Sequence, residues 1–127
     1  MIKGIGTDII QVSRLERTIT NNPRFVDKVF TPNEIAYCES RASKYQSYAA
    51  RFAAKEAVMK AIGTGWDGKI NWADIEVVSD ELGKPELVLH NASLEYVRVH
   101  GIDGLHLSLS HEKDYAIAYV ILESSGA

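Results

Sequence analysis

The sequence predicts a single α+β domain in which an antiparallel sheet packs against a long helix. Helical signals gather in the first half of the chain, where the longest predicted helix runs from about Tyr45 to Ile62. Strand-like segments dominate the second half. No repeat, linker or low-complexity tract divides the 127 residues, so we expect one domain over residues 1–127.

The first half contains one predicted strand followed by helices. Isoleucines and a valine predict a buried strand over residues 2–12. A capping box at residues 13–16 predicts the start of a helix, and a short helical turn is expected after Pro23. A second capping box at residues 31–34 opens the next helix, and the long helix after it is expected to end at Gly63.

The second half contains predicted strands with apolar runs or strict alternation, and one helix between them. We expect strands over residues 75–78 and 85–89, a helix over 92–100 capped by Asn91 and closed by Gly101, and strands over 105–110 and 115–122.

Composition narrows the class of protein. Hydrophobic residues make up 46% and charged residues 24%, as in an ordinary globular protein. No apolar run approaches the roughly 20 residues that span a bilayer, and the N-terminus does not resemble a signal peptide. Cys38 is the only cysteine, so no internal disulfide is possible and we expect a cytoplasmic protein with a buried, unreactive thiol. The net charge of −3 argues against bulk nucleic-acid binding.

One short stretch is basic although the chain as a whole is acidic. Arg14, Arg17, Arg24 and Lys28 are opposed there only by two acidic residues. Such a cluster could face an acidic partner; the alternative is a solvated helix face without a partner.

Asp8 is a carboxylate in a segment that otherwise has the composition of a core strand. Burial of an unpaired carboxylate is costly, so Asp8 needs a partner. A metal ion and a structural salt bridge are both compatible with this segment.

The long helix carries a stripe of alanines, which allows a helix to pack very close to a sheet. Glu56 and Lys60 lie four residues apart beside this stripe. They form either an ordinary surface ion pair or a carboxylate and an ammonium presented together to a bound anion. Gly63, Thr64 and Gly65 come next, where a bare backbone would let a ligand approach closely, although a glycine there also simply ends a helix.

Several segments together resemble the holo-[acyl-carrier-protein] synthases, a family of small bacterial 4′-phosphopantetheinyl transferases. The matching segments are in the family's order and cover nearly the whole chain: residues 4–10, 52–65, 83–85, 107–111 and 116–118. The resemblance implies the family's fold. It also implies transfer of the phosphopantetheine arm of coenzyme A to a serine of apo acyl carrier protein, with release of adenosine 3′,5′-bisphosphate. It further implies a requirement for Mg²⁺ and a homotrimer with active sites between subunits.

The resemblance also implies roles for individual residues. Asp8 and Glu56 match the metal ligands, and Lys60 matches a catalytic residue that contacts the phosphates. The segments that match the coenzyme A site contain Arg51, Gly63, Thr64, Gly65, Pro85 and His111. Because carrier proteins of this type are acidic, the basic stretch is the expected docking surface: Arg14, Arg17, Arg24, Phe25 and Lys28.

The predicted chemistry is consistent with these residues, since Mg²⁺ commonly binds one or two carboxylates together with substrate phosphates and water. The base that deprotonates the serine is either Glu56, directly or through a water that it orients, or a metal-bound water. Two other classes of protein would also fit. A coenzyme A thioesterase would release free thiol without a metal, and a non-catalytic binding module would turn nothing over.

Overall fold

The computed structural model describes residues 1–63 and 69–126. Its helices are α1 (Val12–Asn21), α2 (Phe25–Val29), α3 (Pro32–Glu39), α4 (Lys44–Ile62) and α5 (Asn91–Val99), with a short 3-10 helix η2 (Trp72–Asp74). Its strands are β1 (Ile2–Gln11), β2 (Ile75–Ser79), β3 (Pro85–Leu89), β4 (Gly104–His111) and β5 (Tyr115–Glu123). The predicted α+β class is confirmed, and the strand and helix bounds lie close to those expected.

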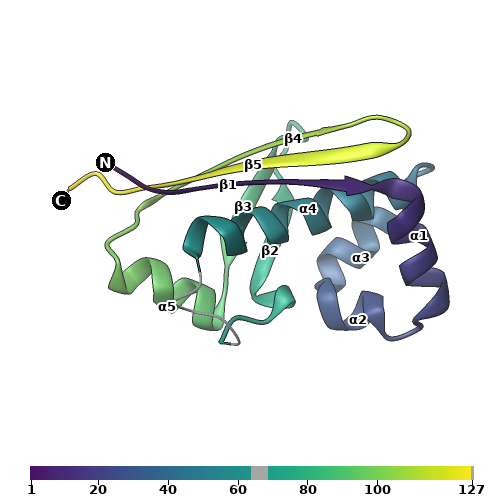
Figure 1. Ribbon diagram of the computed structural model, residues 1–127, viewed down its shortest axis with the longest axis horizontal. Coiled ribbons are helices and arrows are strands. Elements are labelled where there is room, and N and C mark those ends of the chain that lie inside the picture. Colours follow the sequence, from purple (N-terminus) through teal and green to yellow (C-terminus); the bar gives the residue numbers. More distant parts are fainter. Residues whose placement is uncertain (64–68, 127) are drawn as a thin grey trace.

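The strands form two antiparallel sheets rather than one. β1, β5 and β4 form the larger sheet in that order, and β2 pairs with β3 in a hairpin. In Figure 1, α4 runs along one face of the larger sheet, α1 to α3 gather at one end of the molecule, and α5 lies near the other end. The predicted packing of a long helix against an antiparallel sheet is therefore confirmed.

Two glycines of β1 allow α4 to approach the sheet very closely. A Cβ atom on Gly4 or Gly6 would lie less than 3.0 Å from the carbonyl oxygen of Ala61 or Ala57, respectively. The alanines are themselves buried, so backbone meets backbone with almost no side chain between them. This contact fixes which face of β1 meets the helix, because alternate residues of a strand point to opposite faces.

The prediction of a buried β1 was wrong for one of its faces, and the glycines give the reason. Gly4, Gly6 and Asp8 occupy the face toward α4, and the isoleucines at neighbouring positions point the other way. Ile5 is 63% exposed and Ile9 is 59% exposed in the single chain. Together with the outward side chains of β5, they form an apolar outer face on the sheet.

Two predicted helix caps differ from the structure, and one is confirmed. α1 begins at Val12 after Gln11, so the predicted start at Ser13 was wrong: the backbone already turns where β1 ends. α5 begins with Asn91 and has His90 as its N-cap. The capping box of α3 is present as predicted, with Thr31 at the N-cap.

Cys38 is fully buried, as predicted from the sequence. Its burial raises the pKa of the thiol to about 12, which keeps it protonated and unreactive at neutral pH.

We predict that Gly6→Ala lowers the free energy of unfolding by about 3 kcal/mol, the upper end of the usual range for overpacking. The added methyl would collide with the Ala57 carbonyl group, which helix α4 cannot move without repacking. Urea denaturation monitored by circular dichroism measures the loss. Thr7→Ala, an exposed neighbour on the same strand, is the matched control. Equal stability of the two variants would contradict the close helix–strand contact.

Candidate active site

Asp8 and Lys60 are brought together by the contact between β1 and α4. The Lys60 ammonium donates to Asp8 Oδ1 at 2.9 Å and to the Thr7 carbonyl oxygen at 3.1 Å. The Asp8 side chain is 14% exposed, whereas that of Lys60 is 55% exposed. A pair this exposed on one side contributes little to stability, about 0–1 kcal/mol. Of the two alternatives left open for Asp8, the salt bridge is therefore present, and it uses only one carboxylate oxygen.

The other oxygen of Asp8, Oδ2, is buried and has no hydrogen-bond partner in the part of the chain that the structure describes. Glu56 lies nearby on α4 and is half-buried. Burial raises the pKa of Glu56, the negative charge of Asp8 raises it further, and Lys60 partly opposes the shift. Hydrogen bonding to Asp8 raises the pKa of Lys60, so the ammonium keeps its charge.

These two carboxylates fit a hard divalent cation. One buried oxygen lacks a hydrogen-bond donor, and two like charges lie close enough to perturb each other. A cation between them would satisfy the oxygen and remove the repulsion. Oxygen ligands from only one or two carboxylates are what Mg²⁺ takes when a substrate supplies the rest.

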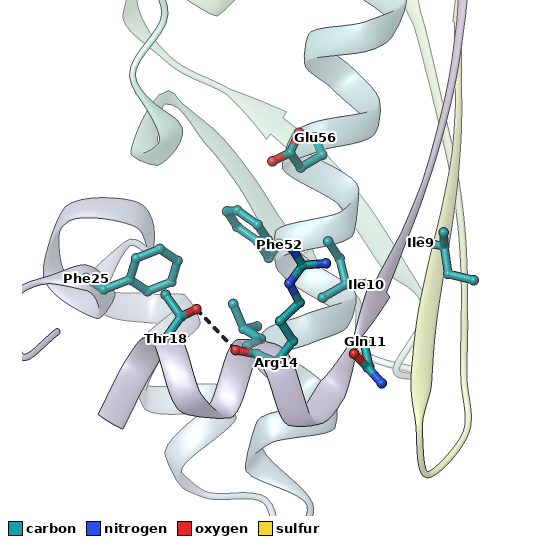
Figure 2. Close-up of a pocket in the computed structure, with 9 residues that line it drawn as sticks. Ile9, Ile10, Gln11, Arg14, Thr18, Phe25, Phe52 and Glu56 are labelled. Atoms are coloured by element: carbon teal, nitrogen blue, oxygen red, sulfur yellow. Dashed lines mark hydrogen bonds between the residues drawn. The ribbon is translucent and has the colours of Figure 1, made fainter. Parts of the chain in front are cut away.

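A cavity of about 370 Å³ opens beside Glu56 (Figure 2). It is framed by β1, α1, α2 and α4, and its lining residues are Ile9, Ile10, Gln11, Arg14, Leu15, Thr18, Phe25, Phe52 and Glu56. Figure 2 shows the Arg14 side chain reaching from α1 toward Phe52, with Glu56 one helical turn further along α4. The cavity thus has apolar walls, with one carboxylate and one guanidinium group among its polar lining.

A second cavity, of about 170 Å³, contains three of the predicted coenzyme A residues. Arg51, Pro85 and His111 all line it, although they come from α4, β3 and the end of β4. Arg51 is only 5% exposed, and its guanidinium group lies 3.9 Å from the centre of the Tyr37 ring. Its Nε is buried and has no hydrogen-bond partner among residues 1–63 and 69–126. A buried guanidinium with an unused donor is suited to an anion.

The second cavity adjoins a polar groove of about 380 Å³. The two share Tyr37, Ser47 and His111, and the groove adds Arg41. Arg41 lies 5.2 Å from the centre of the same Tyr37 ring. His111 Nδ1 is 3.2 Å from Gln46 Oε1, which orients the imidazole ring toward the groove wall. Tyr37 and Ser47 were not predicted as site residues. The spacing of four residues between Tyr37 and Arg41 is the one sequence signal that indicates contact between those two side chains.

The structure therefore places the predicted site residues in two groups. Asp8, Glu56 and Lys60 form one group, and Arg51, Pro85 and His111 the other. The residues that line the first cavity share no member with those that line the second. Gly63 ends α4 with a positive φ of 84°, which favours glycine. Thr64 and Gly65 lie outside the described residues.

The predicted docking residues lie on α1 and around α2. Arg14, Arg17, Arg24 and Lys28 are exposed. Phe25 is half-buried, and its ring meets that of Phe52 edge-on, with 5.7 Å between centroids.

Comparison with known proteins identifies the family. A family model described as the 4′-phosphopantetheinyl transferase superfamily matches residues 4–120. This chain belongs to that superfamily. The chain is similar to the holo-[acyl-carrier-protein] synthase of Solibacter usitatus, with 46% identity over 125 residues, which cover 98% of this chain and 100% of the relative.

Solved structures of the transferase family share the whole fold. A holo-(acyl-carrier-protein) synthase of Bacillus anthracis in complex with CoA (3′,5′-ADP) is 38% identical, with a TM-score of 0.80 over 98% of this chain and 99% of that one. The holo-[acyl-carrier-protein] synthase of Neisseria meningitidis is 36% identical, with a TM-score of 0.87 over 98% of this chain and 100% of that one. The fold expected from the resemblance is confirmed.

Proposed function

We propose that this chain transfers the 4′-phosphopantetheine group of coenzyme A to a serine of apo acyl carrier protein and releases adenosine 3′,5′-bisphosphate. The observation that carries the proposal is the pairing of Asp8 with Glu56 and Lys60 in a chain that belongs to the transferase superfamily. We further propose that the reaction requires Mg²⁺ and takes place in the cytoplasm. Its holo-carrier product would serve fatty acid biosynthesis.

In this proposal Asp8 and Glu56 hold the Mg²⁺ ion. When bound there, the cation would neutralise charge on the pyrophosphate of coenzyme A. Lys60, which donates to Asp8, would add a second positive charge at the transferred phosphate. Glu56, directly or through a water that it orients, would act as the base that takes the serine proton, and a metal-bound water is the alternative base.

The anionic remainder of coenzyme A fits the second group of residues. The buried guanidinium of Arg51 offers an unused donor, and the adjoining groove adds Arg41 and His111. Pro85, together with Ala50 and Leu109, would supply an apolar surface for a base or a pantetheine chain.

We predict that an apo carrier protein gains the mass of one phosphopantetheine when incubated with this chain, coenzyme A and Mg²⁺. Asp8→Ala and Glu56→Gln should each lower the rate at least about 100-fold, and EDTA should do the same to the wild type. Mass spectrometry of the carrier measures the transfer. Glu95→Gln, an exposed carboxylate on α5, is the matched control and should keep the wild-type rate.

The same experiment separates the competing classes. Release of free thiol from acyl-coenzyme A without a mass gain on the carrier would indicate a thioesterase. Binding of coenzyme A without any turnover would indicate a binding module. Either result, obtained with folded protein, contradicts the proposed transfer.

We also propose a homotrimer with active sites shared between subunits. The outer face of the larger sheet is apolar and exposed in the single chain, with Ile5, Ile9, Tyr119 and Ile121 among its residues. Glu56 lines one cavity of a single chain, whereas Arg51, Pro85 and His111 line another. A neighbouring copy that covers the apolar face could supply Arg51 and His111 to the Asp8–Glu56 pair, which would complete one site.

We predict that two inactive variants complement each other in mixed oligomers. Glu56→Gln chains and Arg51→Met chains carry different tags, and doubly tagged trimers are purified after co-expression. Each mixed trimer then has one interface with an intact Glu56 facing an intact Arg51, so about one third of the wild-type activity should return. No recovery above the separate variants, or sedimentation of the wild type as an active monomer, would exclude shared sites.

The basic surface on α1 and α2 is the proposed docking site for the acidic carrier protein. It is continuous with the cavity beside Glu56, because Arg14 and Phe25 line that cavity. In Figure 2 the Arg14 guanidinium lies between the α1 surface and the ring of Phe52. A carrier bound here would bring its serine toward Glu56.

We predict that Arg14→Glu raises the apparent KM for carrier protein at least about tenfold and changes the KM for coenzyme A less than about twofold. Charged residues at the edge of an interface steer the first encounter of the two proteins, and salt screens them. The wild-type rate at low carrier concentration should therefore also fall as the salt concentration rises from about 0.05 to 0.5 M. Initial-rate kinetics measure both effects. Arg98→Glu reverses a charge on α5, far from α1 in Figure 1, and should leave both KM values unchanged. An unaltered carrier KM in both Arg14→Glu and Arg24→Glu would place docking elsewhere.

A further inference from the structure

Lys55 is a fully buried lysine next to the candidate catalytic Glu56. Its side chain is 0% exposed. The ammonium donates to Glu34 Oε1 at 2.8 Å, to the Trp72 carbonyl oxygen at 3.1 Å and to the Ile75 carbonyl oxygen. An ammonium has three donors, so all of them are used.

Glu34, the partner of Lys55, is equally buried and equally satisfied. Its carboxylate accepts from the backbone N–H groups of Thr31 and Val77, each at 2.9 Å. The pair therefore connects the middle of α4 to the start of α3, to η2 and to β2. Neither residue lines the cavities described above, so the pair acts on the site only through the helix.

Stability alone does not explain a buried ion pair. Removal of two charges from water is costly, and well-packed apolar side chains of similar volume often serve as well or better. Burial lowers the pKa of Lys55, and the attraction of Glu34 opposes that shift. A hydrogen-bonded ion pair is directional, because each hydrogen bond constrains a distance and an angle. Contacts between apolar side chains lack this directionality.

The directional hydrogen bonds of Lys55 matter because the contact on the other side of α4, with β1, involves no interlocking side chains. Toward β1 the helix presents alanines against glycines, and such small residues do not interlock like larger side chains. A rotation of α4 by about 20° would move a carboxylate about 6 Å from the helix axis by about 2 Å. Misplacement by about 1 Å can already cost about 100-fold in rate.

We propose that the buried Lys55–Glu34 pair is a positioning device that fixes the rotation of α4, so that Glu56 and Lys60 face Asp8. The proposal rests on the function proposed for the Asp8–Glu56 site. Successive residues of a helix differ by about 100°, so a Lys55 held toward α3 and β2 sets the direction of Glu56, which lies beside the alanines that face β1. Lys55 is a positioning residue, since its ammonium group bonds to Glu34 and to two backbone carbonyl oxygens outside the site.

The test compares cation binding with stability. The variant Lys55→Met with Glu34→Gln removes both charges of the pair together, so neither is left as a buried ion without its partner. Mn²⁺ affinity, measured by electron paramagnetic resonance with coenzyme A but without carrier protein, should fall at least about tenfold, as for other losses of support behind a metal ligand. In the transfer assay kcat should fall by a similar factor, with the KM for coenzyme A within about threefold of wild type.

A core variant separates positioning from loss of stability. Val97→Ala shortens a buried side chain on α5 and should lower Tm while it leaves Mn²⁺ affinity within about twofold of wild type. If Lys55→Met with Glu34→Gln does not fold, Lys55→Arg tests the positioning role instead. This variant keeps the positive charge, but its larger planar group must displace α4. Wild-type Mn²⁺ affinity in either folded variant would overturn the positioning role.

The outcomes also distinguish this inference from the proposed function. A wild-type protein that binds Mn²⁺ but does not modify a carrier refutes the transfer and leaves the Mn²⁺ comparison to decide the role of Lys55. A wild-type protein that binds no Mn²⁺ overturns the positioning of a metal site as well.

Discussion

The close contact between β1 and α4 determines most other features of this fold. Because Gly4 and Gly6 have no side chains, the helix lies directly on the strand, and the next residue on the same face is Asp8. That residue then meets Lys60 one helical turn from Glu56. A strand with larger residues at these two positions would hold the helix further away, and the carboxylates would lie too far apart to share a cation.

The same contact has a consequence on the other side of the sheet. Since Gly4, Gly6 and Asp8 occupy the inner face of β1, Ile5 and Ile9 point outward, where a single chain leaves them exposed. Their exposure is costly in water, and coverage by another copy of the chain would remove that cost. The inner face of β1 thus serves the site, and its outer face is available for assembly.

The helix α4 combines three different surfaces. One carries alanines toward the sheet, one carries Glu56 and Lys60 toward Asp8, and one carries Arg51 and Lys55 into the interior around α3 and β2. The buried charges on the third surface make the interior less apolar than a core needs to be. All donors of the Lys55 ammonium are used, and its hydrogen bonds restrain the helix. The Arg51 guanidinium keeps one donor unused among the described residues, and this donor is available to a ligand.

The sequence by itself determined the features that depend on neighbouring residues. The start of α3 results from the local bonds of its capping box, the end of α4 from a glycine that tolerates positive φ, and the β2–β3 hairpin from its turn and alternation. Family resemblance, also readable from the sequence, predicted roles for Asp8, Glu56 and Lys60 before any geometry. These signals are local or motif-based, so they do not require knowledge of which distant segments meet.

Only the tertiary structure decided the features that depend on distant residues. The partner of Lys60 is Asp8, 52 residues away, and the convergence of Arg51, Pro85 and His111 requires α4, β3 and β4 to be in place. Apolar content alone predicted a buried β1, yet its pairing with β5 and its glycine contact with α4 leave one face exposed. Side-chain direction along a strand is set by register, and register is fixed by packing between elements far apart in the chain.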